Sequence, residues 1–521
     1  MARPHVFPAL LVCYGLVAQT PPPEAAQSPT AETVRSLSLQ EAIKISLQNN
    51  LQVEIAKETR IANQAGLLMA QGAFDWSIYS DLTLRRQESA TSGSPYPGGL
   101  PNKTESTSWN RNLTMGVQKP FVWGGNLQVT YNPVYSYSSG LVINGLQDTS
   151  GNIIGDRPFS TTTPYTGTLG ATYSQSLLRG FGRAATEVNV IVAKKSTQIA
   201  DYQFQQSIIN LVASTENQYW DMVYAQRNLE NAKLALNLAQ KQLNENKIRV
   251  EVGTLAPIEV TSAEAQVAQR EQAIIAADAQ LLNANDALIR ALYPKTERPD
   301  RVTPTDEPTL SHTAVDEPAG ERMALERRVE LKIAKLSLES SGAQLAAAQN
   351  RLKPQLDAFV GYNGNSDNYN RLSPVNTDLT GMKYPGYSVG LSFSMPIANR
   401  SARGSLNQAR ANERSSELSV RDQELGILLQ VRQAFRNVDA SEKGVEAAKK
   451  TRVFREKDLD AEQKKFENGM STNFQVLFKQ NDLDASRSAE LQAQIAYAKS
   501  VTALEQSMGN LLEARNLTFP K

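Results

Sequence analysis

The chain has 521 residues, enough for several ordinary domains or for one elongated molecule. Its net charge of +1 gives no electrostatic reason for binding nucleic acid, so nucleic acid is not expected among its partners. Aromatic residues make up only 7% of the chain, which suits long alanine-rich helices better than several globular cores.

Residues 1–26 are predicted to be a signal peptide and the start of a linker, with cleavage after residue 18 or 26. Arg3 supplies the positive start, and Val6 to Ala18 supply the apolar run. A membrane-anchoring helix is the alternative, although this run is short for a bilayer. Cys13 is the single cysteine and lies inside this segment, so no thiol chemistry is expected after cleavage. The residue before it is not small, as it would be before a lipidated cysteine, so a lipid anchor is not expected.

A first structural repeat is predicted over residues 27–293 and a second over 323–515, with a midpoint linker at 294–322 and a tail at 516–521. The first repeat opens with a helix at about 40–71. It continues with strands at about 75–87 and 166–178, a long helix at 183–250, a tip turn at 251–256 and a helix at 257–293. The second has a helix at 323–352, strands at about 354–363 and 386–396, a long helix at 400–467, a tip turn at 468–472 and a helix at 473–513.

The repeat itself is visible in the residues. Superposing Gly253 on Gly469 gives an offset of 216 residues, and the match continues for about forty residues without a gap. The helices that precede the strands align at an offset of 278, with Leu51 on Val329. These matches predict an internal two-fold repeat.

Apolar and polar residues alternate in the predicted strands, as at Tyr387, Val389, Leu391 and Phe393. About ten such residues are typical of a transmembrane barrel strand, although strands of a soluble sandwich alternate in the same way. After residue 26 no run of apolar residues is long enough for a membrane helix, so only a closed β-barrel could cross a bilayer. The candidate interfacial aromatic residues are Trp76, Trp109, Trp123 and Tyr387.

Two further alternating stretches lie within residues 109–137, joined by the sequence VWGGN. They predict an extra hairpin that either joins the barrel or lies in an outside loop. Pro133 interrupts the second stretch, and this favours an edge or bulge position because proline cannot donate to a strand ladder.

The two long helices each run for 68 residues without proline, which corresponds to about 100 Å. The shorter helices of one repeat together nearly match that length, so each long helix is expected beside two shorter helices stacked end to end. Apolar residues also recur every seven residues, as at Val260, Val267 and Ile274. A soluble antiparallel coiled coil would show the same spacing.

The tip turns depend on Gly253 and Gly469, which permit backbone conformations that break a helix. Thr254 and Asn473 are predicted to be the N-caps of the returning helices. Pro257 fits a first helical turn.

The residues for catalysis are missing from the sequence. Its histidines are His5 and His312, so it provides no metal cluster, histidine-based triad or thiolate site. The stretch GGLPNKT has Asn102 where a phosphate loop needs glycine. We therefore expect no catalytic, cofactor-binding or metal-binding residues, no cofactor and no enzyme activity.

The duplicated plan and its motifs resemble the TolC family of bacterial outer-membrane efflux and secretion channels. The resemblance covers essentially the whole chain after the signal peptide. The motifs are NNLQVEIAK, SQSLLRGFGR, VGTLAPIEVTSAEA, SMPIANR and NGMSTNFQVLFKQ, in that order. The resemblance implies a mixed α and β membrane fold in a homotrimer. Strands of three chains would form one transmembrane β-barrel in the outer membrane, continued by a long α-helical coiled-coil tube in the periplasm.

The resemblance also implies partners: a periplasmic membrane-fusion adaptor, an inner-membrane pump and outer-membrane lipid. The residues expected at the periplasmic tip and adaptor contact are Gly253, Thr254, Leu255, Pro257, Gly469, Met470, Ser471 and Asn473. The candidate pore constriction is Glu259, Gln475 and Phe478. Family members often place acidic residues after the second turn, where this chain has Gln475 and Phe478, so its gate would be less acidic and partly apolar.

The expected function is the outer-membrane exit duct of a tripartite efflux or type I secretion system, which conducts substrates passively. The alternative from another class is a secreted elongated coiled-coil scaffold without channel activity. A general diffusion porin is less favoured because porins do not need long helices.

Overall fold

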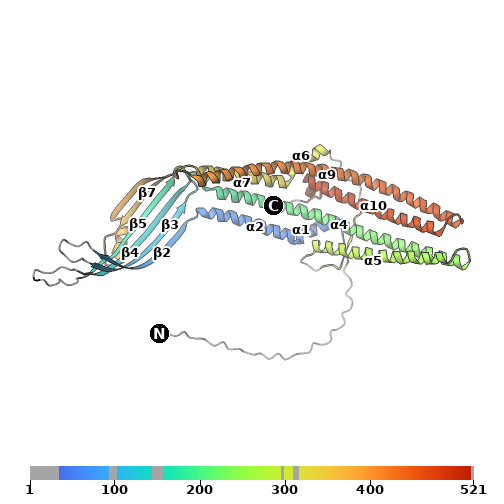
Figure 1. The fold of residues 1–521 in the computed structure, drawn as a ribbon, viewed down its shortest axis with the longest axis horizontal. Helices are drawn as coiled ribbons and strands as arrows, with labels where there is room; N and C mark the ends of the chain where they lie inside the picture. Colours follow the sequence, from blue (N-terminus) through green and yellow to red (C-terminus); the bar gives the residue numbers. More distant parts are fainter. Residues whose placement is uncertain are drawn as a thin grey trace, which may run out of the picture.

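The computed structural model describes residues 34–92, 103–143, 150, 157–294, 298–308 and 316–517. The predicted signal peptide, Cys13 and His312 lie outside these residues. The molecule is elongated, with a β-sheet at one end and two helical hairpins at the other (Figure 1). Between them, shorter helices lie alongside two very long ones, so sheet and hairpin tips are at opposite ends of the chain's long axis.

Six antiparallel strands form the main sheet in the order β2-β3-β4-β5-β7-β8. They are β2 (Ser77–Ser92), β3 (Lys103–Pro120), β4 (Gly125–Ile143), β5 (Arg157–Ser176), β7 (Gln355–Asn365) and β8 (Tyr384–Ser394). The first repeat supplies four strands and the second supplies two. Strands β2 and β8 are the two edges of this sheet.

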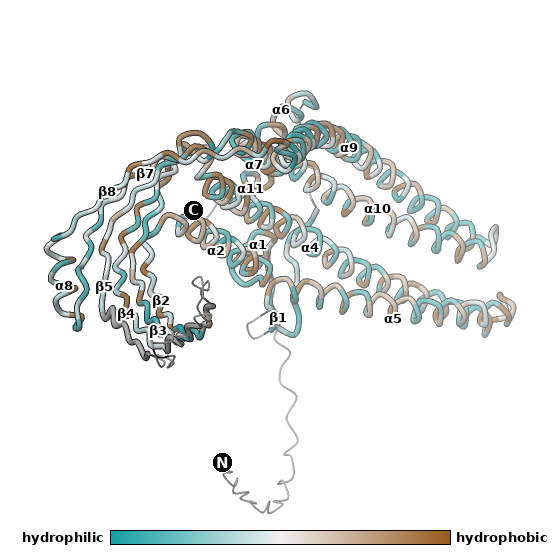
Figure 2. Tube along the Cα trace, turned by 60° about the vertical axis from the view of Figure 1, so that its left-hand side comes forward, coloured by the Kyte–Doolittle hydropathy of each residue, from teal (hydrophilic) through white to brown (hydrophobic). Residues whose placement is uncertain are grey.

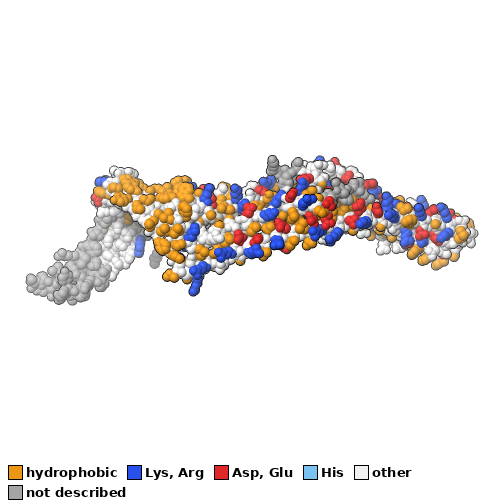
Figure 3. Space-filling model, turned by 90° about the horizontal axis from the view of Figure 1, so that it is seen from above, with side chains coloured by type: hydrophobic (Ala, Val, Ile, Leu, Met, Phe, Trp, Pro, Cys, Tyr) orange, Lys and Arg blue, Asp and Glu red, His pale blue; other side chains and the backbone are white. Residues whose placement is uncertain are grey.

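The two faces of the sheet differ in polarity, as the alternation predicts. One row of directly paired residues crosses all six strands on one face: Ile78, Val117, Val129, Ala171, Tyr362 and Tyr387. The next row, on the other face, is Tyr79, Gly116, Thr130, Gly170, Asn363 and Gly386. The apolar face is open at the edge strands, where Ile78 is 83% exposed and Tyr387 85%. Hydrophobic side chains gather over this end of the molecule, while charged ones cover the helices (Figure 3).

The extra hairpin belongs to the sheet, which decides between the two positions that the sequence left open. Its strands are β3 and β4. Because β4 is paired on both sides, the edge position predicted as one alternative for Pro133 is wrong, whereas an irregularity in the ladder, the other alternative, is present. The sheet tolerates this proline because the β3–β4 ladder is interrupted opposite it, between Asn112 and Met115. The register with β5 shifts two residues further on, between Tyr135 and Ser136.

The helices of the first repeat are α1 (Leu39–Asn49), α2 (Leu51–Gln71), α3 (Arg183–Thr186), α4 (Val188–Glu251) and α5 (Ile258–Leu292), with a 3₁₀ turn, η1, at Gly72–Phe74. The long helix expected at 183–250 is broken near its start, at Glu187, whose backbone angles leave the helical region (φ −88°, ψ 5°). Helix α4 packs along α1 and α2 on one length and along α5 on the other. The expected stacking of shorter helices beside the long one is therefore present.

The second repeat contains α6 (Glu317–Arg327), α7 (Val329–Arg351), α8 (Leu372–Thr380), α9 (Arg400–Glu467), α10 (Asn473–Met508) and α11 (Leu511–Ala514). Helix α9 begins and ends where the sequence predicts. The helix expected at 323–352 is instead two helices that meet at Arg328, which adopts an extended backbone (φ −61°, ψ 126°). The helix expected at 473–513 stops at Met508, because Gly509 turns the chain in the left-handed region (φ 74°).

The midpoint linker is more ordered than the sequence predicts. Within it, β6 (Arg301–Pro304) pairs in parallel with β1 (Val34–Leu37). Tyr219 of α4 anchors this pair: its hydroxyl donates to the Leu37 carbonyl (3.1 Å) or the Asp306 carboxylate (3.0 Å) and accepts from the Thr305 amide (3.2 Å). Burial raises the pKa of Tyr219 to about 12, so its hydroxyl stays protonated at physiological pH.

The largest apolar core lies in this middle section, around Tyr219, Trp220, Leu281, Leu288 and Leu292. Helices α1 and α5, which pack along different lengths of α4, both contribute to this core. The core therefore joins the part of the shaft next to the sheet to the part next to the tips. Among the described residues, no helix is both long enough and apolar enough to cross a membrane.

Candidate functional site

The candidate site is the end of the molecule where the α4–α5 and α9–α10 hairpins turn (Figure 2). Gly253 (φ 76°) and Gly469 (φ 72°) both occupy the left-handed region. After each helix the two following amides bond back in the same way: Gly253 to Val250 and Thr254 to Arg249, Gly469 to Phe466 and Met470 to Lys465. This is a Schellman motif, so both turns use glycine for the same stereochemical reason.

The predicted caps of the returning helices are wrong. The Thr254 hydroxyl bonds back to the Arg249 carbonyl (3.0 Å), and α5 begins after Pro257 without a side-chain cap. In the second turn Thr472 is the N-cap, since its hydroxyl accepts from the Gln475 amide. Asn473 is instead the first residue of α10, and its side chain is used for a longer-range contact.

That contact joins the two hairpins. The Asn473 side chain is 1% exposed, donates to the Glu259 carboxylate (2.9 Å) and accepts from Gln242 (3.3 Å). The guanidinium of Arg249 lies over the Phe466 ring, 4.5 Å from its centroid. Leu255 packs against an apolar cluster of the second hairpin, formed by Leu459, Phe466, Val476 and Leu483. The turns therefore form one surface.

Large apolar side chains are exposed on this surface. Met470 is 72% exposed, Phe474 66% and Phe478 49%. Phe474 and Phe478 are four residues apart on α10, so they lie on the same side of the helix. Gln475 is also exposed, whereas Glu259 is partly buried against Asn473. Of the predicted constriction residues, the structure thus leaves Gln475 and Phe478 exposed and uses Glu259 between the hairpins.

Polar contacts stiffen the second turn. The Ser471 hydroxyl donates to Glu462, and Lys465 pairs with the same carboxylate at 3.1 Å. The Ser471 hydrogen bond and Lys465 together hold the pKa of Glu462 below its usual range. The carboxylate therefore remains charged in mildly acidic solution.

Further from the tip, an ion pair links α5 to α10. Arg270 lies 2.7 Å from Asp484, and both side chains are largely buried. Gln266 donates to Asn481 (2.7 Å) one turn closer to the tip. Burial raises the pKa of Asp484, an effect that Arg270 opposes.

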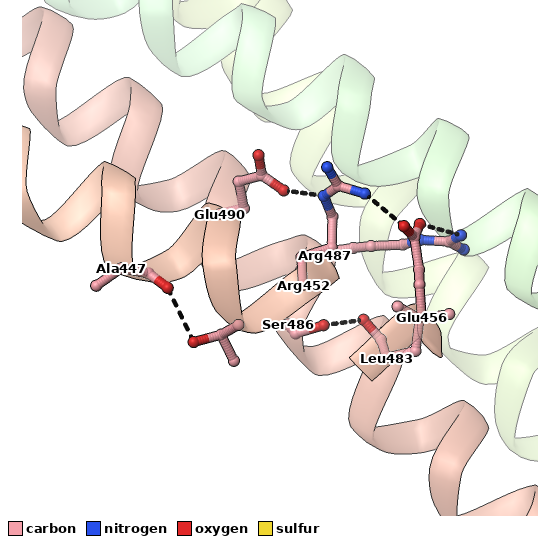
Figure 4. A network of polar contacts seen from close by, with 8 residues as sticks. Ala447, Arg452, Glu456, Leu483, Ser486, Arg487 and Glu490 are labelled. Atoms are coloured by element: carbon pink, nitrogen blue, oxygen red, sulfur yellow. Dashed lines mark hydrogen bonds and ion pairs between the residues drawn. The ribbon is translucent and has the colours of Figure 1, made fainter. Parts of the chain in front are cut away.

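A second network holds α9 against α10 (Figure 4). Arg452 bonds to Glu490 on α10 and pairs with Glu456 on its own helix at 2.8 Å. Arg487 of α10 lies 3.4 Å from the same Glu456 carboxylate. The Arg270–Asp484 ion pair thus links the two hairpins to each other, and this network links the two helices of the second hairpin.

Sequence reasoning found the glycines but missed the residues that join the hairpins. Gln242, Arg270 and Asp484 were not predicted, because their partners lie over two hundred residues away in the chain. The exposure of Phe474 beside Phe478 could have been predicted, because their four-residue spacing places both rings on the same side of a helix. Among the described residues, no cluster of three or more histidine, cysteine or acidic side chains could hold a metal ion.

The predicted interfacial aromatic residues lie at distinct places on the sheet. Trp76 precedes β2 and Trp123 lies in the β3–β4 turn, both at the helical end. Trp109 lies far along β3 from that end, where it pairs with Arg86. Tyr387 is near the start of β8, opposite Tyr362.

An open amphipathic sheet joined to a long shaft of paired helical hairpins defines the class of elongated outer-membrane channel proteins. The family model described as outer membrane efflux protein matches residues 155–292 and 322–510. The chain belongs to this family, which is a family of channels and not of enzymes, and it is an outer-membrane efflux channel protein.

Individual relatives agree. Outer membrane protein TolC of Vibrio cholerae is 25% identical over 347 residues, covering 66% of this chain and 77% of that protein. TolC of Escherichia coli K12 is 24% identical over 332 residues, covering 61% and 65%.

Solved structures share the fold. The outer-membrane channel OprN has a TM-score of 0.64 at 15% identity and covers 94% of this chain and 98% of its own. The open-state MtrE channel of Neisseria gonorrhoeae has a TM-score of 0.62 at 15% identity, covering 91% and 89%. These findings give no support to the alternative of a secreted scaffold.

Proposed function

We propose that three copies of this chain form one continuous duct that conducts substrates passively from a periplasmic adaptor and an inner-membrane pump to the outside. The duct would serve a tripartite efflux or type I secretion system. The observation that carries the proposal is the pair of rows across the sheet, apolar on one face and small or polar on the other. A sheet with this pattern fits lipid on one side and a water-filled lumen on the other.

The sheet needs further strands to close, because edge strands with unpaired backbone groups are not tolerated in a bilayer. Since it has an even number of antiparallel strands, β8 of one copy runs antiparallel to β2 of the next and can pair with it. Three copies then supply eighteen strands. Barrels of 16–18 strands leave an aqueous channel, whereas six strands alone would not.

At the other end, six turns from three copies would ring the periplasmic mouth. The exposed Met470 and Phe474 offer apolar contacts for an adaptor, and Phe478 offers an apolar constriction. Because the duct is proposed to conduct substrates passively, the inner-membrane pump would supply the energy for transport.

Single-channel conductance of the purified protein in planar bilayers tests the proposal, with native protein beside Phe478→Ala. We expect low native conductance that rises several-fold in the variant, because removal of the phenyl rings would let water enter the constriction. Phe454→Ala is the control, since Phe454 is also an exposed phenylalanine (66%) but lies on α9 away from the turn.

Two outcomes would contradict the proposal. Large native conductance that neither substitution changes would indicate an open pore without a gate at the tip. A protein that never inserts into the bilayer would exclude the channel altogether.

A further inference from the structure

Two arginines lie among aromatic side chains on the apolar face of the sheet, near its outer end. Arg86 of β2 is paired with Trp109 of β3, and Arg111 of β3 is paired with Tyr135 of β4. Tyr135 is in turn paired with Tyr165 of β5. We refer to these five residues as the arginine–aromatic cluster.

The cluster shares its face with the apolar rows. Leu84 is paired with Arg111, and Arg86 follows Leu84 by two residues, so their side chains point the same way. Arg85, between them, points to the polar face. In the proposed barrel the cluster therefore faces lipid, and Arg85 faces the lumen.

The cluster also lies at a defined height. At the helical end of the sheet, Lys119 lies over the Trp76 ring, 5.8 Å from its centroid. From Lys119 to Arg111 the apolar face of β3 carries Val117, Met115 and Leu113. This distance is about 27 Å along the strand, or roughly 20 Å across a bilayer for a strand tilted by about 40°. The apolar band of such barrels is about 25 Å tall, so Arg111 lies near its outer border, and Arg86, opposite Trp109 two residues further along β3, lies at the level of the outer headgroups.

Both guanidinium groups lie close to aromatic rings. Arg86 is 5.1 Å from the centroid of Trp109 and Arg111 is 5.4 Å from that of Tyr135. The rings of Tyr135 and Tyr165 lie 5.0 Å apart and support the second pair. Cation–π contact engages a face of the guanidinium and leaves N–H groups at its edge for a planar or tetrahedral anion.

The charge of the cluster is largely uncompensated. Within the described part of the chain, Arg111 makes no ion pair. Arg86 pairs with Glu88, but both side chains are more than half exposed, and such pairs contribute little. Two cations at a lipid-facing headgroup level favour a negatively charged lipid.

We propose that the arginine–aromatic cluster binds the phosphate of an anionic lipid headgroup in the leaflet remote from the helical shaft. Arg86 and Arg111 would donate to the phosphate oxygens, while Trp109 and Tyr135 hold the guanidinium groups in place. The inference rests on the proposed barrel, since without a membrane the cluster would have no lipid to face.

Lipid retention measures this directly. Native protein, Arg86→Gln/Arg111→Gln and Arg85→Gln are reconstituted into vesicles of phosphatidylcholine with phosphatidylglycerol, then extracted and examined by native mass spectrometry for bound lipid. We expect enrichment of phosphatidylglycerol on native protein and on the Arg85→Gln control, and about a tenfold loss of that enrichment in the double variant, because charge-assisted hydrogen bonds are removed. Arg86→Lys/Arg111→Lys should retain part of it, because the charge remains.

The outcomes separate this inference from the channel proposal. Equal lipid binding by native protein and double variant, or equal loss in the Arg85→Gln control, would overturn the headgroup site while leaving the channel intact. Failure to insert into these vesicles would overturn both. Competition by inorganic phosphate as effective as that by lipid would identify a free-phosphate site and contradict the assignment to lipid. Circular dichroism of each variant confirms that the sheet has formed.

Discussion

Single residues set the geometry of the tip. Gly253 and Gly469 adopt positive φ with no heavy atom near the position of a Cβ, so space does not exclude a side chain at either residue. The requirement is conformational, since a side chain in the left-handed region crowds its own backbone.

We expect Gly253→Ala and Gly469→Ala each to destabilise the hairpin by about 1–2 kcal/mol through left-handed strain. The measurement is the thermal unfolding midpoint of the helical signal by circular dichroism. Gly444→Ala is the control, because Gly444 lies inside α9 with open space around it, and alanine should raise helix stability there. Equal effects at all three positions would refute the conformational explanation.

A buried charge cluster provides a second residue-scale test. Glu216, which is 0% exposed, and Glu505 both pair with Arg515, at 2.6 and 2.9 Å. Burial raises the pKa of Glu505, and Arg515 only partly opposes this. A carboxyl with a raised folded pKa binds its proton more tightly in the native state. Its ionised form therefore destabilises the fold above that pKa, and this penalty disappears as the pH falls through it.

Glu505→Gln should therefore raise the unfolding midpoint relative to native protein at neutral pH, and the difference should shrink as the pH falls through the raised pKa of Glu505. Circular dichroism melts at several pH values measure this. Glu513→Gln is the control, since that side chain is 70% exposed and its substitution should shift the midpoint little at any pH. A difference that grows in acid would contradict the sign.

At the scale of elements, the sequence predicted helix α9 to the residue because its pattern continues without proline, and Asn468 and Gly469 then end it. It did not predict α8, a nine-residue helix between β7 and β8 that contains Pro374. Helix α8 packs on β5 through Val375 and Leu379, which are 0% and 1% exposed. Such short segments are stabilised by tertiary packing that a local pattern does not contain.

In the candidate site, too, local features could be predicted from the sequence and long-range contacts could not. Gly253 and Gly469 were predictable because a left-handed turn is a local property of the backbone. The roles of Asn473 and Glu259 were not, since their hydrogen bond joins two hairpins that the sequence places far apart.

The amphipathic sheet predicts unequal responses of neighbouring residues on β3. Met115→Arg places a charge on the apolar face, which faces lipid near the bilayer midplane in the proposed barrel, and should cost about 2–4 kcal/mol. Thr114→Arg, one residue earlier, lies on the face proposed to line the lumen and should cost far less. The measurement is the fraction of heat-modifiable folded barrel on electrophoresis after assembly into membranes. Equal losses for both variants would contradict the assignment of faces.

At the scale of the whole molecule, the sheet of one chain does not close on itself. The sheet has two free edges, and exposed apolar side chains gather over it. The first repeat carries the extra β3–β4 hairpin, so in the proposed barrel the two halves of each copy would contribute four and two strands.

If three copies form the proposed barrel, the protein in detergent should have the mass of three 57.1 kDa chains, or slightly less if the predicted signal peptide is removed. Native mass spectrometry gives the copy number directly, and unfolding in urea before measurement supplies the monomer control. A predominance of dimers or tetramers would contradict the closure of eighteen strands.

The pairing of β1 with β6 bears on how the chain matures. Val34 of β1 pairs with Arg301 of β6. Strand β1 therefore cannot pair until the ribosome has synthesised the entire first repeat and the start of the linker. Contacts between such distant residues form slowly, because the loop between them must close first. We therefore expect the middle of the shaft to be completed late, when β1 and β6 pair. Until that step we expect the middle of the shaft to stay accessible to chaperones and proteases, so the new chain is vulnerable in the section that later holds its largest apolar core.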